Sequence, residues 1–221
     1  MKIPKGMLLA STIDKFEKTL KNRPHEVIKT MPPGGKRRIK AHARVENKQT
    51  EIALPLDYSF FQIKTPVEIL RLPPRMDSPL QLKASRDANG KWLTSALKLN
   101  KNILEDLIDL PRVVASLFPS EQWLTWLDLS SNLLNQIPAE LLQLTSLKIL
   151  YLHGNKIGST KELVKLQPLI NLTKLTAHGN PAELETGYFI TVLAALPNLV
   201  KLDFTAVSLN DKLAAERIRL S

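Results

Sequence analysis

The chain has 221 residues and no cysteine, which excludes disulfides, cysteine-based zinc sites and thiol nucleophiles. It has no run of 18 apolar residues that could span a membrane, and residues 7–10 form too short an apolar run for a signal-peptide core, so we expect a cytoplasmic protein. Residues 1–50 hold 13 Lys/Arg and 4 Asp/Glu, whereas residues 92–221 hold 12 of each, so nine of the ten net positive charges belong to an N-terminal extension.

Residues 1–50 are predicted to form a basic extension with a short helix, because apolar residues recur at helical spacing between residues 9 and 20. Pro-Pro-Gly-Gly at 32–35 then breaks the chain. The basic side chains that follow are Lys36, Arg37, Arg38, Lys40 and Arg44. They fit three interpretations: contact with an acidic surface such as the tails of tubulin, a solubilising tail, or nucleic-acid binding with nuclear targeting. Residues 29–57 contain no aromatic side chain for base stacking, which disfavours the third.

Residues 51–91 are predicted to be an extended segment that packs against the rest of the protein or against a partner. The stretch 54–82 contains five prolines, which disfavour regular helix and sheet. It is nevertheless rich in large apolar side chains between residues 54 and 72. A segment with so much apolar surface seldom remains free in water.

Residues 92–221 contain an internal repeat. LTWLDLSSNLL at 124–134, LKILYLHGNKI at 147–157 and LTKLTAHGN at 172–180 follow the pattern LxxLxLxxNxL, and degenerate copies occur at 97–104 and 199–209. The key position falls at residues 102, 132, 155, 180 and 207. Its last three spacings lie in the 20–29-residue range of the leucine-rich repeat. We therefore predict an α/β fold, a short leucine-rich-repeat solenoid of about five repeats with a parallel sheet on the concave face and helical returns.

The motif has a physical cause. In a short strand, side chains alternate between the two faces, so the LxL pair points into the core. The Asn at the strand end can bond backbone groups of its own and the next repeat that sheet pairing leaves free. Between strands we expect helical returns at 104–117, interrupted at Pro111, and at 161–166 and 182–195. A last helix at 211–220 would cover the end of the sheet.

Side chains between the repeated leucines of the motif point out of the concave face and are the candidate protein-binding residues. These are Trp126, Ile149, Tyr151, His153, Lys174, Thr176 and His178. Exposed aromatic patches are commonly binding sites. The alternative is that segment 54–72 folds back over the patch. The pattern also places Asp203 on the same face in the last repeat.

The histidines of this face occupy equivalent positions in adjacent repeats, so their rings could stack about 5 Å apart. A metal site would need a third ligand, which the pattern does not supply, so no metal or other cofactor is expected. The sequence has no phosphate-binding glycine loop and no nucleophile elbow, so no catalytic residue is expected and we predict that the chain is not an enzyme.

The repeat region resembles the SDS22-like leucine-rich-repeat proteins, which include the leucine-rich-repeat light chain of axonemal outer-arm dynein. The resemblance rests on GNP at 179–181, GY at 187–188 and LPNLVKLD at 196–203, although the family's usual Tyr-Arg is Tyr188-Phe189 here. PLDYSF at 55–60, LYLHGN at 150–155 and HGNP at 178–181 more specifically resemble the leucine-rich-repeat-containing protein 51 family. This resemblance covers roughly residues 54–215.

The resemblance implies a non-enzymatic protein-interaction subunit, an adaptor or structural protein of ciliated cells. The expected partners are proteins of a large assembly such as a ciliary or flagellar axoneme, with tubulin or dynein-associated proteins, and neither nucleic acid nor membrane is expected. The alternative is a subunit of a nuclear ribonucleoprotein or of another intracellular regulatory complex, because relatives of this repeat type assemble there.

Overall fold

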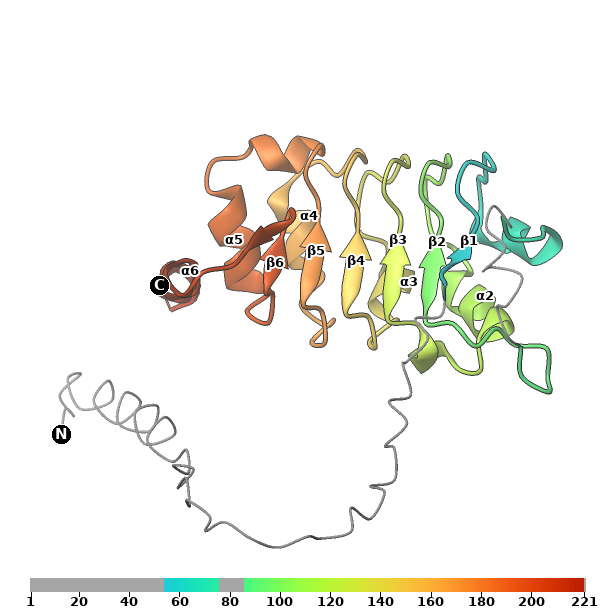
Figure 1. The fold of residues 1–221 in the computed structure, drawn as a ribbon. Helices are drawn as coiled ribbons and strands as arrows, with labels where there is room; N and C mark the ends of the chain where they lie inside the picture. The colour runs from blue at the N-terminus through green and yellow to red at the C-terminus, as the bar shows by residue number, and fades with distance from the viewer. Residues whose placement is uncertain (1–53, 76–85, 221) are drawn as a thin grey trace, which may run out of the picture. The chain divides into compact units, whose positions relative to one another are not determined.

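A computed structural model describes residues 54–75 and 86–220. The expected helix at 9–20 and the basic run at 36–44 lie outside these residues. The described part forms one sheet of seven strands in sequence order, drawn side by side in Figure 1. The strands are β1 (Leu56–Asp57), β2 (Ala96–Lys98), β3 (Trp126–Asp128), β4 (Ile149–Tyr151), β5 (Lys174–Thr176), β6 (Lys201–Leu202) and β7 (Thr205–Ala206). Neighbouring strands are parallel except for β6 and β7.

The repeated leucines of the motif align across the sheet and build the core. One leucine from each of β2 to β6 lies opposite the next in register, and all are fully buried: Leu97, Leu127, Leu150, Leu175 and Leu202. Each strand is only two or three residues long, so a single repeat cannot bury its apolar face and the repeats must stack. This arrangement confirms the predicted leucine-rich-repeat solenoid.

The asparagine of each repeat ties two repeats together. Nδ2 of Asn155 donates to the carbonyl of Leu152 in its own repeat and to that of Leu129, at 2.8 and 3.0 Å, and its Oδ1 accepts from the backbone N–H of Leu134. Asn102, Asn132 and Asn180 make equivalent bonds. The partner is therefore the preceding repeat. The prediction that the Asn side chain bonds the next repeat was wrong, because the loop that carries it lies beside the end of the preceding strand.

Short helices return the chain behind the sheet. They are α2 (Leu110–Leu117), η3 (Glu121–Trp123), α3 (Ala139–Leu142), α4 (Thr160–Val164), η4 (Pro181–Leu184) and α5 (Tyr188–Ala195), where η marks a 3₁₀ helix. Figure 1 shows helices α2 to α5 on one side of the strand layer. The opposite side of the sheet is called the open face below. Within the described residues, no helix is both long and apolar enough to cross a membrane.

Two of the expected helical returns were wrong in detail. Pro111 does not interrupt a helix but lies in the first turn of α2, where its missing N–H costs no hydrogen bond. The expected helix at 182–195 is split, because the 3₁₀ helix η4 ends at Leu184 and α5 begins only after Gly187, its N-cap with a φ of +80°. Leu184, near the start of the expected helix, lies in the 3₁₀ helix and is exposed.

Residues 54–75 form an N-terminal cap on the repeats. β1 extends the sheet at the β2 edge, and the 3₁₀ helix η1 (Pro66–Arg71) packs against α2. The cap buries Leu56, Tyr58, Ile63 and Ile69 in the common core. Asn102 bonds it to the first repeat, since its Nδ2 donates to the Tyr58 carbonyl. Thus the described part of this segment covers the edge of the solenoid.

The C-terminal end is closed by a hairpin and a helix. After β6 the chain reverses at Asp203 and Phe204, both with positive φ, and returns as β7 antiparallel to β6. The last copy therefore does not continue as a repeat after Leu202. Helix α6 (Leu209–Arg219) follows, begins with a capping box between Ser208 and Asp211, and packs against α5.

Candidate protein-binding face

The sheet register places the predicted binding residues in rows on the open face. Trp126, Ile149, Lys174 and Lys201 lie directly opposite one another along β3 to β6. Tyr151 of β4 lies between Asp128 and Thr176 in the next row. Neighbouring strands are about 4.8 Å apart, so side chains within a row are in contact range. The rows thus change from aromatic and aliphatic side chains at β3 and β4 to cationic ones at β5 and β6.

Aromatic rings form a continuous cluster on this face. Trp126 packs edge-on against Tyr151, with ring centroids 6.0 Å apart. Tyr151 in turn contacts His153, and Phe204 contacts Tyr151, His153 and the ring of His178 at 5.7–6.0 Å. We call these five residues the aromatic cluster. Phe204 remains 61% exposed and the other four are partly exposed, so the cluster presents ring surface to a partner.

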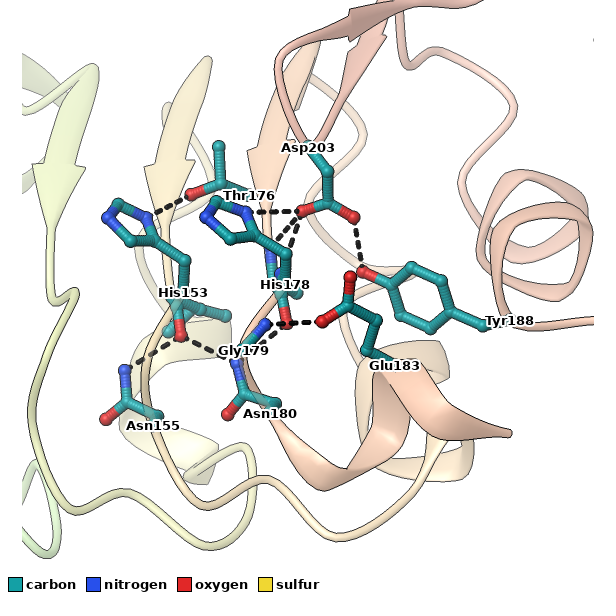
Figure 2. Close-up of polar contacts among 11 residues, drawn as sticks. His153, Asn155, Thr176, His178, Gly179, Asn180, Glu183, Tyr188 and Asp203 are labelled. Carbon is teal, nitrogen blue, oxygen red and sulfur yellow. Dashed lines mark hydrogen bonds and ion pairs between the residues drawn. The ribbon is translucent and has the colours of Figure 1, made fainter. Parts of the chain in front are cut away.

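The two histidines stack as the repeat spacing predicted. Their ring centroids are 4.8 Å apart and the planes differ by 5°, and Figure 2 shows the rings side by side. Nδ1 of His178 lies 3.3 Å from Oδ1 of Asp203, and because a carboxylate only accepts, this nitrogen carries the proton. Nδ1 of His153 lies 2.8 Å from Oγ1 of Thr176. Both rings are therefore held at Nδ1.

Asp203 organises the C-terminal side of the cluster. Its Oδ1 accepts from the backbone N–H groups of Ala177 and His178, and its Oδ2 accepts from the hydroxyl of Tyr188 at 2.7 Å (Figure 2). Burial and the bond to Asp203 raise the pKa of Tyr188, which keeps its hydroxyl protonated as the donor. These bonds fix the tight turn that projects Phe204 over the histidines.

Thr176 is the one predicted binding residue that the structure removes from the surface. It is 2% exposed, because its short side chain lies between larger neighbours and its hydroxyl is engaged by His153. It positions that ring and does not offer a contact surface. Trp126 is also partly enclosed: its indole Nε1 is buried and has no hydrogen-bond partner among the described residues.

At Asp203 and Phe204 the prediction of a further repeat was wrong. The pattern placed Asp203 on the sheet surface and gave no role to Phe204, because it treated residues 199–209 as a further, degenerate copy of the repeat. The hairpin instead leaves Phe204 61% exposed, while the partly buried Asp203 carboxylate bonds Tyr188 and His178. The available signal was the missing asparagine at Val207, since without that side chain the usual loop cannot form.

The face carries a pH-sensitive group. Burial, together with the neighbouring His178, lowers the pKa of His153 below its usual value, and these effects outweigh the attraction of Asp128 and Asp203. Burial and the charge of Asp128 raise the pKa of Tyr151, which stays neutral at physiological pH. In the described parts of the chain, no three His, Asp or Glu side chains are grouped to hold a metal ion.

The lowered pKa of His153 predicts acid sensitivity. The unfolded chain takes up a proton at this residue as pH falls through about 6.5, whereas the folded protein resists doing so, so stability decreases below about that pH. We expect the unfolding midpoint of the wild type to fall more between pH 7.5 and 5.5 than that of His153→Gln. Thermal unfolding of both proteins across this range measures the difference. Parallel pH profiles would contradict the assignment.

Comparison with known proteins supports the same architecture. No protein-family profile matches the chain. It is similar to a chain from the crystal structure of the Drosophila melanogaster SNF/U2A′ complex, with a TM-score of 0.51 and 20% identity over 73% of this chain and 78% of that one, a likeness of fold alone. It is 38% identical over 80 residues to leucine-rich repeat-containing protein 23 of Xenopus tropicalis, covering 36% of this chain and 23% of that protein.

A closer likeness extends over most of the chain. Leucine-rich repeat-containing protein 51 of Macaca mulatta is 42% identical over 163 residues, and the protein of that name from Homo sapiens is 41% identical over the same length. In both cases the matched region covers 73% of this chain and 83% of the relative. Identity at this level over most of both chains, together with the repeat solenoid, shows that the chain belongs to the leucine-rich-repeat-containing protein 51 family.

Proposed function

We propose that the chain is a non-catalytic adaptor or structural subunit that binds a protein partner through the aromatic cluster on its open face. The observation that carries this proposal is the continuous, partly exposed ring surface from Trp126 to His178, completed by Phe204. Trp and Tyr are the residue types that most often dominate binding energy in interfaces. Leucine-rich-repeat families of this kind are protein-interaction modules, and the relatives named above are leucine-rich-repeat proteins.

The position of the N-terminal cap supports an external partner. Had segment 54–72 folded back over Trp126 and Tyr151, the patch would be part of the core. Instead, β1 pairs with β2 at the edge of the sheet, and the ring contacts described for the cluster come from β3 to β5 and the Phe204 turn. The cluster therefore offers its surface on the face that the cap leaves uncovered.

We further propose that the protein works in a ciliary or flagellar axonemal assembly, where its basic extension contacts an acidic surface such as the tails of tubulin. The support is the family resemblance and the charge distribution, since residues 1–50 carry a surplus of nine positive charges and residues 92–221 carry none. Such a tail increases association rates, while a packed apolar face provides specificity. Two surfaces would then act together in attachment.

Salt dependence separates the two surfaces. Deleting residues 1–50 should weaken pelleting with microtubules strongly at low salt and much less at high salt, because exposed charges are screened beyond about 8–10 Å at physiological ionic strength. Trp126→Ala with Tyr151→Ala should instead cost about 2 kcal/mol or more in affinity for a purified axonemal fraction, with little salt dependence. Both are measured by co-sedimentation of the full chain across salt concentrations, with and without competing RNA.

Trp123→Ala is the matched control, because Trp123 is 41% exposed but lies in η3 and outside the cluster. We expect it to bind as the wild type does. The same salt profile for the tail deletion and the double variant would contradict the division into two surfaces. Release of the protein from microtubules by RNA, with tight RNA binding, would favour the ribonucleoprotein alternative.

A further inference from the structure

Two lysines face each other across the last parallel strand pair. Lys174 of β5 lies directly opposite Lys201 of β6, and neither makes an ion pair with any side chain in residues 54–75 or 86–220. Like charges directly opposite each other destabilise a sheet. When such a repulsion is not offset by other interactions in the folded chain, the position is expected to serve a function.

The acidic groups of the open face are already engaged elsewhere. Asp57 forms an ion pair with the Lys98 ammonium at 2.8 Å. Asp128 accepts hydrogen bonds from the backbone N–H and the hydroxyl of Ser130. Asp203 accepts hydrogen bonds from Tyr188 and His178. The charge of Lys98 is thus neutralised within the folded chain, by a carboxylate on the neighbouring strand. Lys174 and Lys201 have no such carboxylate among residues 54–75 and 86–220, so the two positive charges are not neutralised within the described part of the chain.

The same row continues with apolar side chains. Ile149 lies directly opposite Lys174 on its other side, and Trp126 lies opposite Ile149. A ligand that crosses the strands would therefore meet two cations and then two apolar side chains, each step about 4.8 Å apart. Residues 1–50 have a net charge of +9, so an acidic ligand is better supplied by another protein.

We propose that this row binds an acidic segment of the partner protein, which places an Asp or Glu carboxylate between Lys174 and Lys201 and an apolar side chain against Ile149 and Trp126. The inference rests on the proposed function and adds the chemical class of the partner. The carboxylate relieves the repulsion between the two ammonium groups, and the apolar contact supplies affinity that salt does not screen.

Nuclear magnetic resonance of the full chain tests this inference site by site. The probes are a nine-residue peptide of Glu-Glu-Leu triplets and a matched peptide of Lys-Lys-Leu triplets, each at physiological salt. The acidic peptide should shift the amide signals of Lys174 and Lys201 and the indole signal of Trp126, and the basic peptide should not. Binding of the acidic peptide to the extension shifts other signals and is therefore seen separately.

Charge reversal supplies the decisive variant. Lys174→Glu with Lys201→Glu should weaken the acidic peptide at this face at least about tenfold and make the face prefer the basic peptide. Lys161→Glu with Lys212→Glu, two exposed lysines of α4 and α6, changes the net charge equally and should leave binding within about twofold. Amide spectra of both variants report whether they are folded.

Three results would overturn the acidic-segment inference: equal shifts from both peptides, no shift of these signals with either peptide, or equal weakening by both charge-reversal variants. Failure of the proposed function is distinguishable. If Trp126→Ala with Tyr151→Ala still abolishes capture of the axonemal partner, the open face binds a partner that is not acidic. If that double variant also captures the partner normally, the open face is not the binding surface.

Discussion

A chain that begins at residue 84 should lose most of its folding stability, whereas a chain that begins at residue 50 should keep it. The shorter chain lacks the N-terminal cap and with it Leu56, Tyr58, Ile63 and Ile69, which are buried in the common core. Each fully buried side chain of this size contributes about 1.5–3 kcal/mol. Their combined loss is comparable with the total stability of a typical domain, about 5–15 kcal/mol.

Denaturant unfolding of the two fragments and the full chain measures this effect. The shorter fragment should also bind an apolar dye, because the β2 edge and the side chains beneath it become exposed. Equal unfolding midpoints for the fragments beginning at 50 and 84, with equal dye binding, would show that the cap adds nothing to the solenoid. The full chain and the fragment beginning at 50 should unfold alike.

Leu150→Ala should lower the free energy of unfolding by about 2–5 kcal/mol, as cavity-forming substitutions in packed cores do. Leu150 is fully buried at the centre of the sheet, in register with Leu127 and Leu175 on the flanking strands. No neighbour can move to fill the space without disturbing two other repeats. Chemical denaturation monitored by circular dichroism measures the loss.

Leu184→Ala is the matched control, because this substitution removes the same atoms as Leu150→Ala but from a side chain that is 88% exposed. It should change the free energy of unfolding by less than about 0.5 kcal/mol. A similar loss in both variants would mean that Leu150 is not part of a stacked core, and the repeat interpretation of the central strands would fail.

The sequence predicted the repeated part of the fold because each leucine and asparagine has one geometric role. The LxL pair and the Asn at the strand end specify strand, face and turn within a few residues, so the register of β2 to β5 follows from alignment of the motifs. His153 and His178 follow from the same logic, since equivalent positions in adjacent repeats must lie one strand apart.

The cap was harder to predict, although a signal was present. LDYS at 56–59 has the same pattern as LDLS at 127–130, and in both the aspartate accepts hydrogen bonds from the serine two residues later. Phe60 also shares the positive φ of Ser131 at the equivalent place. The prolines and the absence of the asparagine, replaced by Phe61, concealed a degenerate repeat within an apparently irregular segment.

The C-terminal side of the candidate site could not be predicted from periodicity at all. A repeat pattern assumes that the chain continues, whereas Asp203 and Phe204 adopt positive φ and turn back. This reversal depends on tertiary contacts: Tyr188 and the backbone of residues 177 and 178 hold the Asp203 carboxylate. The repeat pattern therefore could not predict that Phe204 belongs to the aromatic cluster.

Hydroxyl-radical footprinting of the full chain, free and in its native complex, tests the binding role of the open face most directly. The rings of Trp126, Tyr151, His153 and Phe204 are reactive toward the radical and partly exposed in the free protein. We predict that the complex protects them, while Trp123 on η3 is oxidised equally in both states. Protection confined to the helical side of the solenoid, with these four side chains oxidised as in the free chain, would contradict the account.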